Sequence, residues 1–190
     1  RRIVESHPRA IGIIDGYFER VPSVWHKEIL FAIRQGIAVF GAASMGALRA
    51  AELAPFGMVG VGAIFGAFRD GTLEDDDEVA VIHGPAVLGY PSLSDAMVNI
   101  RRTLSDAVSV GVISHTSRAK LEAIAKNLPY PDRTYATIIE LARNIDIDLG
   151  DVVALADWLP AGRVDQKRED AVALLREMRA FAENGSVPTP

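Results

Sequence analysis

The stretch Val39-Phe-Gly-Ala-Ala-Ser-Met-Gly-Ala-Leu-Arg-Ala50 marks the point where the chain is expected to pass from a strand into a helix. Apolar residues indicate a strand over 37–40, and helical spacing begins directly after Ser44. The small residues from Gly41 to Gly46 would let another molecule approach the backbone closely. Because the first N–H groups of a helix have no partner within it, this turn is a candidate site of chemistry.

Two roles are open for Ser44. Its hydroxyl could cap the helix by accepting a hydrogen bond from the Ala47 N–H group, since serine is a favoured N-cap residue. Alternatively it is a nucleophile, and the N–H groups of Met45 and Gly46 form an oxyanion hole. The turn could also cradle a phosphate, but it lacks the Gly-Lys-Ser/Thr of a P-loop and the spacing of the dinucleotide fingerprint.

The composition indicates a folded protein whose 190 residues are 49% hydrophobic. A net charge of −5 argues against a general nucleic-acid binder. The chain has no cysteine, which excludes disulfides, persulfide carriage and thiolate metal sites. Neither a membrane span nor a signal peptide is apparent, so we expect a cytoplasmic protein. The chain begins with Arg1 rather than Met, so we expect further residues before it.

Hydrophobic periodicity predicts an α/β fold, with a small parallel sheet flanked by helices in the N-terminal half and a helical C-terminal half. Strands are expected at 9–16, 37–40 and 79–82. Helices are expected at 23–35 (with Ser23 as N-cap), 44–53, 63–69, 94–108, 116–127, 133–143, 149–158 and 166–183. We expect one domain over 1–190, comprising an α/β part over about 9–90, a helical part over about 91–184 and a loose tail at 185–190.

Three polar residues follow the predicted strands. Ligands bind at the carboxyl ends of parallel strands, and those ends would bring Asp15, Ser44 and His83 to one edge as a candidate Ser/His/Asp set. Each partner also has a plainer interpretation. Asp15 begins an Asp-Gly pair that is typical of turns, and His83 could be bonded to backbone beside Gly84.

The helix expected at 23–35 offers a different base. Lys27 falls near its apolar stripe, and a partly desolvated lysine there would give up its own proton more readily and could accept one from a serine. The commoner arrangement keeps the ammonium in water. His26 is a second titratable candidate, although such a residue is more often a surface group.

Two charged runs have less specific interpretations. Glu74-Asp-Asp-Asp-Glu78 suits a solvated loop or a docking patch for a basic partner better than a metal site, because five adjacent acids cannot all face one ion. Asp165-Gln-Lys-Arg-Glu-Asp170 has the composition of a solvated helix start with a possible role at an interface.

Several motifs together resemble the core of TfuA proteins. They are Ile13-Ile-Asp-Gly-Tyr-Phe18, Val24-Trp-His-Lys-Glu-Ile-Leu30, Gly41-Ala-Ala-Ser-Met-Gly-Ala-Leu-Arg-Ala-Ala-Glu-Leu53, Phe56-Gly-Met58, Val61-Gly62 with Ile64-Phe65, and Asp77-Glu-Val-Ala80 with His83. The resemblance is dense over residues 10–85 and thinner afterwards, where Asp165-Gln-Lys-Arg168 is the best match. Members usually carry an additional N-terminal segment, which fits the start of this sequence.

The resemblance implies a role in sulfur delivery. TfuA proteins accompany YcaO enzymes, which use ATP to convert peptide amides to thioamides. The implied activity is hydrolysis of the C-terminal thiocarboxylate of a ThiS-like carrier, together with docking on YcaO and help in holding its peptide or protein substrate. The resemblance also implies a catalytic Ser–Lys pair at Ser44 and Lys27, with no metal or cofactor. Arg49 could steer the anionic carrier tail or be a plain surface residue. A non-catalytic adaptor for carrier and peptide is the alternative.

Overall fold

The computed structural model describes residues 2–15 and 24–185, which form two compact units. Unit 1 contains residues up to Asp76 and those from Gln166 onward, and unit 2 contains Asp77–Asp165. Unit 1 therefore includes a helix from the far end of the sequence.

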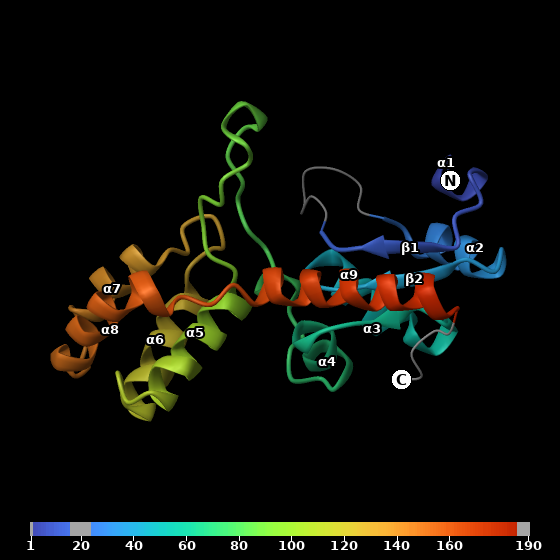
Figure 1. The fold of residues 1–190 in the computed structure, drawn as a ribbon. Coiled ribbons are helices and arrows are strands. Elements are labelled where there is room, and N and C mark those ends of the chain that lie inside the picture. The colour runs from blue at the N-terminus through green and yellow to red at the C-terminus, as the bar shows by residue number, and fades with distance from the viewer. Residues whose placement is uncertain (1, 16–23, 186–190) are drawn as a thin grey trace. The chain divides into compact units, whose positions relative to one another are not determined.

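A parallel sheet lies at the centre of unit 1 (Figure 1). In the described residues its strands are β1 (Ala10–Ile13), β2 (Ala38–Gly41) and β3 (Val59–Gly60), in the order β1-β2-β3. Both pairings are parallel. This confirms the predicted small parallel sheet and two of its three strands.

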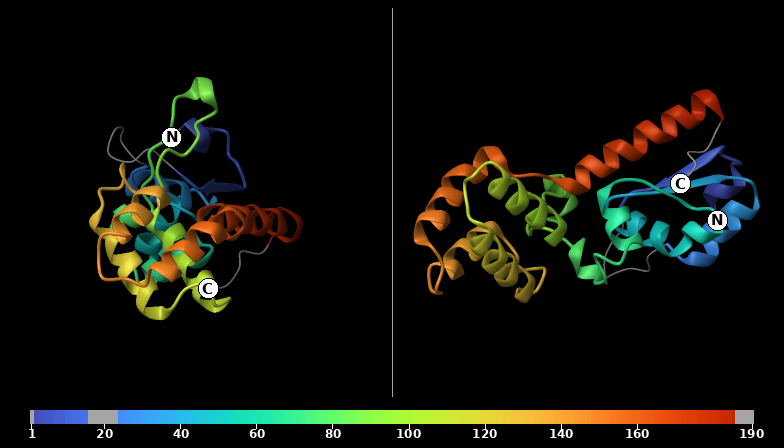
Figure 2. Two further views of the ribbon diagram at one scale, coloured as in Figure 1. Left: turned by 90° about the vertical axis from the view of Figure 1, so that its left-hand side faces the viewer. Right: turned by 90° about the horizontal axis from the view of Figure 1, so that it is seen from below.

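Helices cover both faces of this sheet. Alternate residues of β2 point to opposite faces, so Val39 packs with α2 (His26–Arg34) and α3 (Met45–Leu53), while Phe40 packs against α9 (Gln166–Asn184). Figure 2 shows the sheet between α9 and the other two helices. Smaller elements complete the unit: α1 (Arg2–Glu5), η1 (Ala54–Phe56) and α4 (Ala63–Arg69).

Helix α9 runs antiparallel to the strands. At its start, the Lys167 ammonium lies 3.5 Å from the carboxylate of Asp15, which follows β1. At its end, Arg9, which precedes β1, donates to the Ala182 carbonyl over 3.0 Å. The first turn of α9 therefore lies at the carboxyl edge of the sheet.

Asp170 fixes that first turn in place. Its carboxylate accepts hydrogen bonds from the N–H groups of Ala63 (3.1 Å) and Ile64 (2.8 Å), which start α4, and from the Gln166 side chain (2.7 Å). Asp170 is 3% exposed. A carboxylate is the preferred partner of unpaired N–H groups at a helix start. The expected solvated helix start at 165–170 is therefore wrong for Gln166 and Asp170, which are buried.

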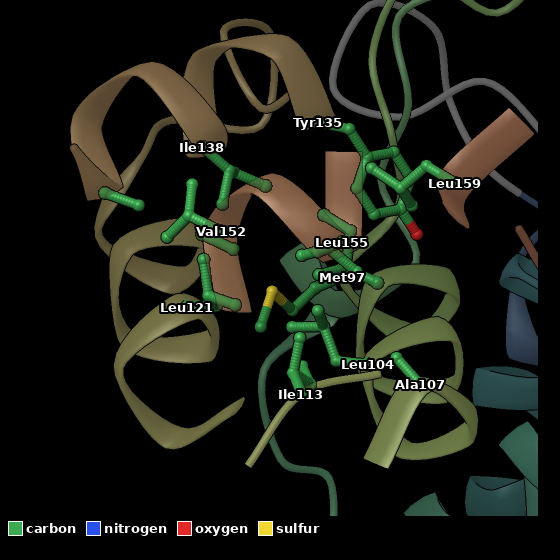
Figure 3. Close-up of a cluster of buried hydrophobic side chains, with 13 residues drawn as sticks. Met97, Leu104, Ala107, Ile113, Leu121, Tyr135, Ile138, Val152, Leu155 and Leu159 are labelled. Atoms are coloured by element: carbon green, nitrogen blue, oxygen red, sulfur yellow. The ribbon is translucent and has the colours of Figure 1, made fainter. Parts of the chain in front are cut away.

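Unit 2 is built from helices around one core. These are α5 (Met97–Ser109), α6 (His115–Asn127), α7 (Tyr135–Ala142) and α8 (Leu149–Gly162), with the short turns η2 (Asp76–Glu78) and η3 (Ala86–Leu88) before them. Each long helix contributes to the core in Figure 3, where Met97, Leu121, Ile138 and Leu155 converge. The predicted helical C-terminal half is confirmed.

A buried arginine holds the start of this unit together. Arg133 is fully buried and donates to the carbonyl groups of Ala125, Leu128 and Asp77 and to the Asp77 carboxylate. Burial of a guanidinium costs free energy unless its donors are satisfied, and these four bonds supply the partners.

The strand expected at 79–82 is wrong. Val79 and Ala80 are buried in unit 2, but the segment has no strand pairing, and the third strand is Val59–Gly60. A short apolar run fits a buried extended segment as well as a strand, and periodicity does not separate the two.

Two expected features lie outside the described residues: the N-cap residue Ser23 and the tail at 186–190. The residue at the N-cap position of α2 is Trp25. Within 2–15 and 24–185, no helix is long and apolar enough to cross a membrane.

Replacing Asp170 with alanine should destabilise unit 1. The substitution leaves the N–H groups of Ala63 and Ile64 without their acceptor, so we expect a loss of about 2–4 kcal/mol in unfolding free energy. Urea unfolding measures it. The control is Glu183→Ala on the same helix, which breaks only an exposed pair with Arg179 and should cost less than about 0.5 kcal/mol. Equal losses in the two variants would contradict this role of Asp170.

Candidate functional site

The turn between β2 and α3 has an unusual backbone. Ala43 has φ +70°, in the left-handed region that non-glycine residues rarely occupy. Ser44 follows with φ −130° and ψ −116°. The Ala42 and Ser44 N–H groups donate to the carbonyls of Ile13 (3.1 Å) and Ile14 (3.2 Å), so the turn is held on the end of β1. Such strained residues are found at functional sites, where the surrounding structure compensates their cost.

The glycines of this turn are required by the chain's own packing. A Cβ atom on Gly46 would lie 1.8 Å from the Ile13 carbonyl oxygen, and one on Gly41 would lie 2.2 Å from the Gly46 carbonyl oxygen. Helix α3 therefore begins in direct contact with the end of β1. This replaces our expectation that the glycines make room for another molecule.

The Ser44 side chain does not cap α3. The residue occupies the N-cap position, yet its hydroxyl makes no capping hydrogen bond, because the Ala47 N–H donates to the Ser44 carbonyl instead (2.9 Å). The cap expected from the sequence is therefore wrong. Ser44 is 5% exposed, and its hydroxyl is not used to hold the helix start.

The N–H groups of Met45 and Gly46 were expected to form an oxyanion hole. Within the described part of the chain, the Met45 and Gly46 N–H groups donate to no protein acceptor. They belong to the first turn of a helix, where the backbone dipoles favour a negative charge. The turn thus combines a hydroxyl with two adjacent donors, an arrangement that suits acyl transfer.

The predicted base, Lys27, is exposed in the first turn of α2. Of the two arrangements considered for Lys27, the structure has the commoner one, with the side chain in water. Among the described residues, its ammonium and the Ser44 hydroxyl form no hydrogen bond with each other, and the role of Lys27 stays a prediction.

The neighbours of Lys27 connect α2 to α3. His26 bonds the Glu52 carboxylate (2.7 Å), and Arg49 donates to the Val24 carbonyl (3.0 Å) and to Glu52 (2.7 Å). The Arg49 side chain is only 15% exposed. These contacts hold the start of α2 against α3, and they involve the guanidinium that could have steered an anionic tail or been a plain surface group.

The predicted Ser/His/Asp set rested on three parallel strands that would end at one edge. Asp15 and Ser44 do follow neighbouring parallel strands, β1 and β2. His83, however, belongs to unit 2 and follows no strand of the sheet, so the strand arrangement on which the set depended is wrong. The His83 ring donates from Nδ1 to the Tyr90 carbonyl (3.2 Å), the backbone role considered as the alternative.

The acidic run also differs from expectation. Glu74, Asp75 and Asp76 are exposed, whereas Glu78 is buried and pairs with Arg101 (2.9 Å). Burial alone would raise the pKa of Asp77, but hydrogen bonds from Lys126 and Arg133, together with their charges, lower it below its ordinary value. Over the residues that the structure describes, no group of three or more His, Cys, Asp or Glu side chains could hold a metal ion.

An apolar cavity of about 300 Å³ lies between β1, α1 and α2. It is lined by Ile11, Ile13, Val24 and Ile29, and it reaches Asp15 at the carboxyl end of β1. One of its lining residues, Asp15, therefore lies at the same edge of the sheet as the serine turn.

Sequence reasoning missed the contribution of α9. Gln166, Lys167 and Asp170 reach the carboxyl edge of the sheet, although they are more than 100 positions away from Ser44. A run of polar residues at a helix start is normally expected to face solvent. The neighbouring sequence does not show that the partners of this run are the backbone of α4 and the side chain of Asp15.

The described geometry can be compared with known proteins. The family model for TfuA-like protein matches residues 15–134, a span that includes Lys27, Ser44 and His83 and ends before α9. A search of curated proteins gives no match.

Replacing Gly46 with alanine should disrupt the turn. Alanine normally stabilises a helix relative to glycine by about 1 kcal/mol, but here its methyl group would overlap the Ile13 carbonyl. We expect a loss of about 3 kcal/mol or more in urea unfolding. Gly66→Ala within α4 is the matched control, since a Cβ there meets nothing within 4 Å, and it should be neutral or stabilising. Similar stability of the two variants would rule out the close contact.

Proposed function

This chain belongs to the TfuA-like protein family, and from that premise we propose that it is a sulfur-delivery hydrolase. Its substrate is the C-terminal thiocarboxylate of a ThiS-like carrier protein, and its product is sulfide for a YcaO enzyme that thioamidates a peptide or protein. The observation that carries the proposal is Ser44 itself: a hydroxyl at a strained strand-to-helix turn that leaves the capping of its own helix to the backbone.

The first step transfers the acyl group to the serine. Ser44 Oγ attacks the thiocarboxylate carbon, Lys27 accepts the hydroxyl proton, and the N–H groups of Met45 and Gly46 stabilise the negative oxygen. The C–O bond forms and the C–S bond breaks. Sulfur leaves as HS⁻ with the proton that Lys27 returns, so no oxidant or reductant is needed.

The second step regenerates the serine. Water attacks the acyl-serine ester, again with Lys27 as the base, and the carrier leaves with an ordinary carboxylate. The sum is thiocarboxylate plus water giving carboxylate plus hydrogen sulfide. A chain without cysteine fits this scheme, because the sulfur departs directly and is never held as a persulfide.

Carrier docking supplies a reason for an exposed lysine to act as a base. A carrier seated over the start of α2 would exclude water from Lys27 and bring its thiocarboxylate to the amine. The contacts from Arg49 and His26 keep that helix start in a fixed position against α3.

A second candidate function is that of an adaptor, and one feature of unit 2 favours it. The segment 83–92 extends away from the helices of its unit as two antiparallel runs (Figure 1), joined by the pairing of His83 with Ser92. It carries exposed apolar side chains, among them Val87 (87% exposed) and Leu88 (67%). Exposed apolar groups of this kind suit docking on a partner protein, which we propose to be the YcaO enzyme.

Sulfide release separates the hydrolase from the adaptor. The protein alone is incubated with thiocarboxylated ThiS-like carrier, and sulfide is measured over time. We expect Ser44→Ala to reduce the rate roughly 10³-fold or more, because the nucleophile is lost. Ser109→Ala removes an exposed hydroxyl in unit 2 and should have no effect. Unchanged release by Ser44→Ala would refute the serine mechanism and favour the adaptor.

The same assay tests the base. Lys27→Met should lower kcat by about 10²–10⁴-fold, the usual contribution of a general base, with little change in stability because the side chain is exposed. Lys120→Met, which removes a lysine of unit 2 paired with Asp146, is the charge-matched control. If Lys27→Met retained activity while His83→Ala lost it, histidine would be the base.

A further inference from the structure

The start of α9 brings a second lysine to the carboxyl edge of the sheet. The Lys167 side chain is only 13% exposed, and its ammonium lies 3.5 Å from the Asp15 carboxylate. On either side of it, Gln166 and Asp170 are buried and bonded to each other. Because Asp170 also holds the N–H groups that start α4, the position of Lys167 is fixed by the fold.

The strand order places the first turn of α9 along the sheet edge that carries the serine turn. Asp15 follows β1, Ser44 follows β2, and Ala63 follows β3, in the spatial order β1-β2-β3. In the first turn of α9, Lys167 contacts Asp15 and Asp170 contacts Ala63. It also packs through Ala171 against the cluster that contains Ala42 and Ala43. The helix start therefore spans the edge on which Ser44 occupies the middle position.

The charge of Lys167 is unusual for its place in a helix. A cation in the first turn opposes the helix dipole and costs some stability, which the nearby Asp15 carboxylate offsets. Attraction to an anion is stronger at a half-buried site than in open water, since the effective dielectric constant is lower. The Lys167 ammonium lowers the stability of the helix start, and its partly buried position strengthens its attraction to an anion. Its place therefore suits the binding of an anion at the sheet edge.

The proposed substrate is such an anion. A thiocarboxylate carries a full negative charge at neutral pH, and attack by the serine oxygen increases the charge at the reacting carbon. The Arg49 guanidinium bonds Val24 and Glu52, whereas the Lys167 ammonium lies at the carboxyl edge of the sheet, beside Asp15.

We propose that Lys167 is the substrate-binding residue that receives the anionic C-terminal end of the acyl substrate, and that Asp15 holds its ammonium in place between turnovers. The proposal rests on the proposed function for the class of substrate. It assigns to the Asp15 carboxylate an electrostatic role toward a lysine, in place of a triad role toward a histidine. The observations behind the assignment are the contacts of Lys167 and Asp170 at the sheet edge.

The test measures binding in the Ser44→Ala variant of the whole 190-residue chain, which separates binding from hydrolysis. The probes are a ThiS-like carrier with a C-terminal thiocarboxylate and the same carrier with a C-terminal amide, compared by calorimetry. We expect the anionic carrier to bind about tenfold more tightly, in line with a charge-assisted contact. Lys167→Met should abolish that preference, and Lys167→Arg should retain most of it.

The control is Arg179→Met, at the other end of α9. It removes one positive charge from the same helix, from a side chain that is 82% exposed and paired only along the surface with Glu183, and it should keep the preference. If the Lys167–Asp15 pair were purely structural, Lys167→Met would lower the unfolding temperature and weaken the binding of both carriers by the same factor. That result would overturn the proposal.

Kinetics with Ser44 intact distinguish this proposal from the proposed function. Lys167→Met should raise KM for the thiocarboxylated carrier about tenfold with a smaller change in kcat. Hydrolysis with an unaltered KM in this variant would refute the role of Lys167 and leave the serine mechanism standing. The protein could instead release no sulfide and still prefer the anionic carrier in a way that depends on Lys167. That result would support the binding role of Lys167 and refute the hydrolase activity.

Discussion

The contact between the start of α3 and the end of β1 determines the candidate site. Gly46 lies so close to the Ile13 carbonyl that no side chain fits between them, and the N–H groups of Ala42 and Ser44 donate to the same end of β1. The chain must therefore turn sharply from β2 into α3, which accounts for the positive φ of Ala43. A looser turn would allow Ser44 to cap its helix in the ordinary way. Here the backbone makes those contacts, and the Ser44 hydroxyl makes no capping hydrogen bond.

A second constraint closes unit 1 around this turn. The Asp170 carboxylate satisfies the start of α4 and simultaneously sets the start of α9, so two helix starts and the serine turn share one edge of the sheet. Because α9 runs back along the strands, its apolar residues Leu174 and Met178 cover the sheet face while its first turn supplies polar groups at the edge. One helix thus performs both a packing and a site-forming role, even though unit 2 separates it from the rest of unit 1 in sequence.

Local features of the sequence were sufficient for much of the fold. The turn at 41–46 and the helices that follow it were predictable because glycine, alanine and serine patterns act over a few residues. The error at 79–82 has a physical cause: Val79 and Ala80 are buried by helices of unit 2, and burial without strand pairing leaves the same apolar pattern. Strand β3, only Val59–Gly60, is too short to produce a pattern. The inward position of Asp170 depends on backbone donors more than 100 positions away, which no local pattern reveals.

The proposed reaction requires two different lysines. A general base must lose its proton to accept one from the serine, whereas a cation that holds an anionic tail must keep its proton throughout the cycle. One ammonium cannot meet both requirements at the same pH. The two lysines differ in position: the Lys167 ammonium lies 3.5 Å from the Asp15 carboxylate at the sheet edge, whereas Lys27 is exposed in the first turn of α2. Each lysine also approaches from its own helix, α2 or α9, so the substrate can be held by one while the proton moves through the other.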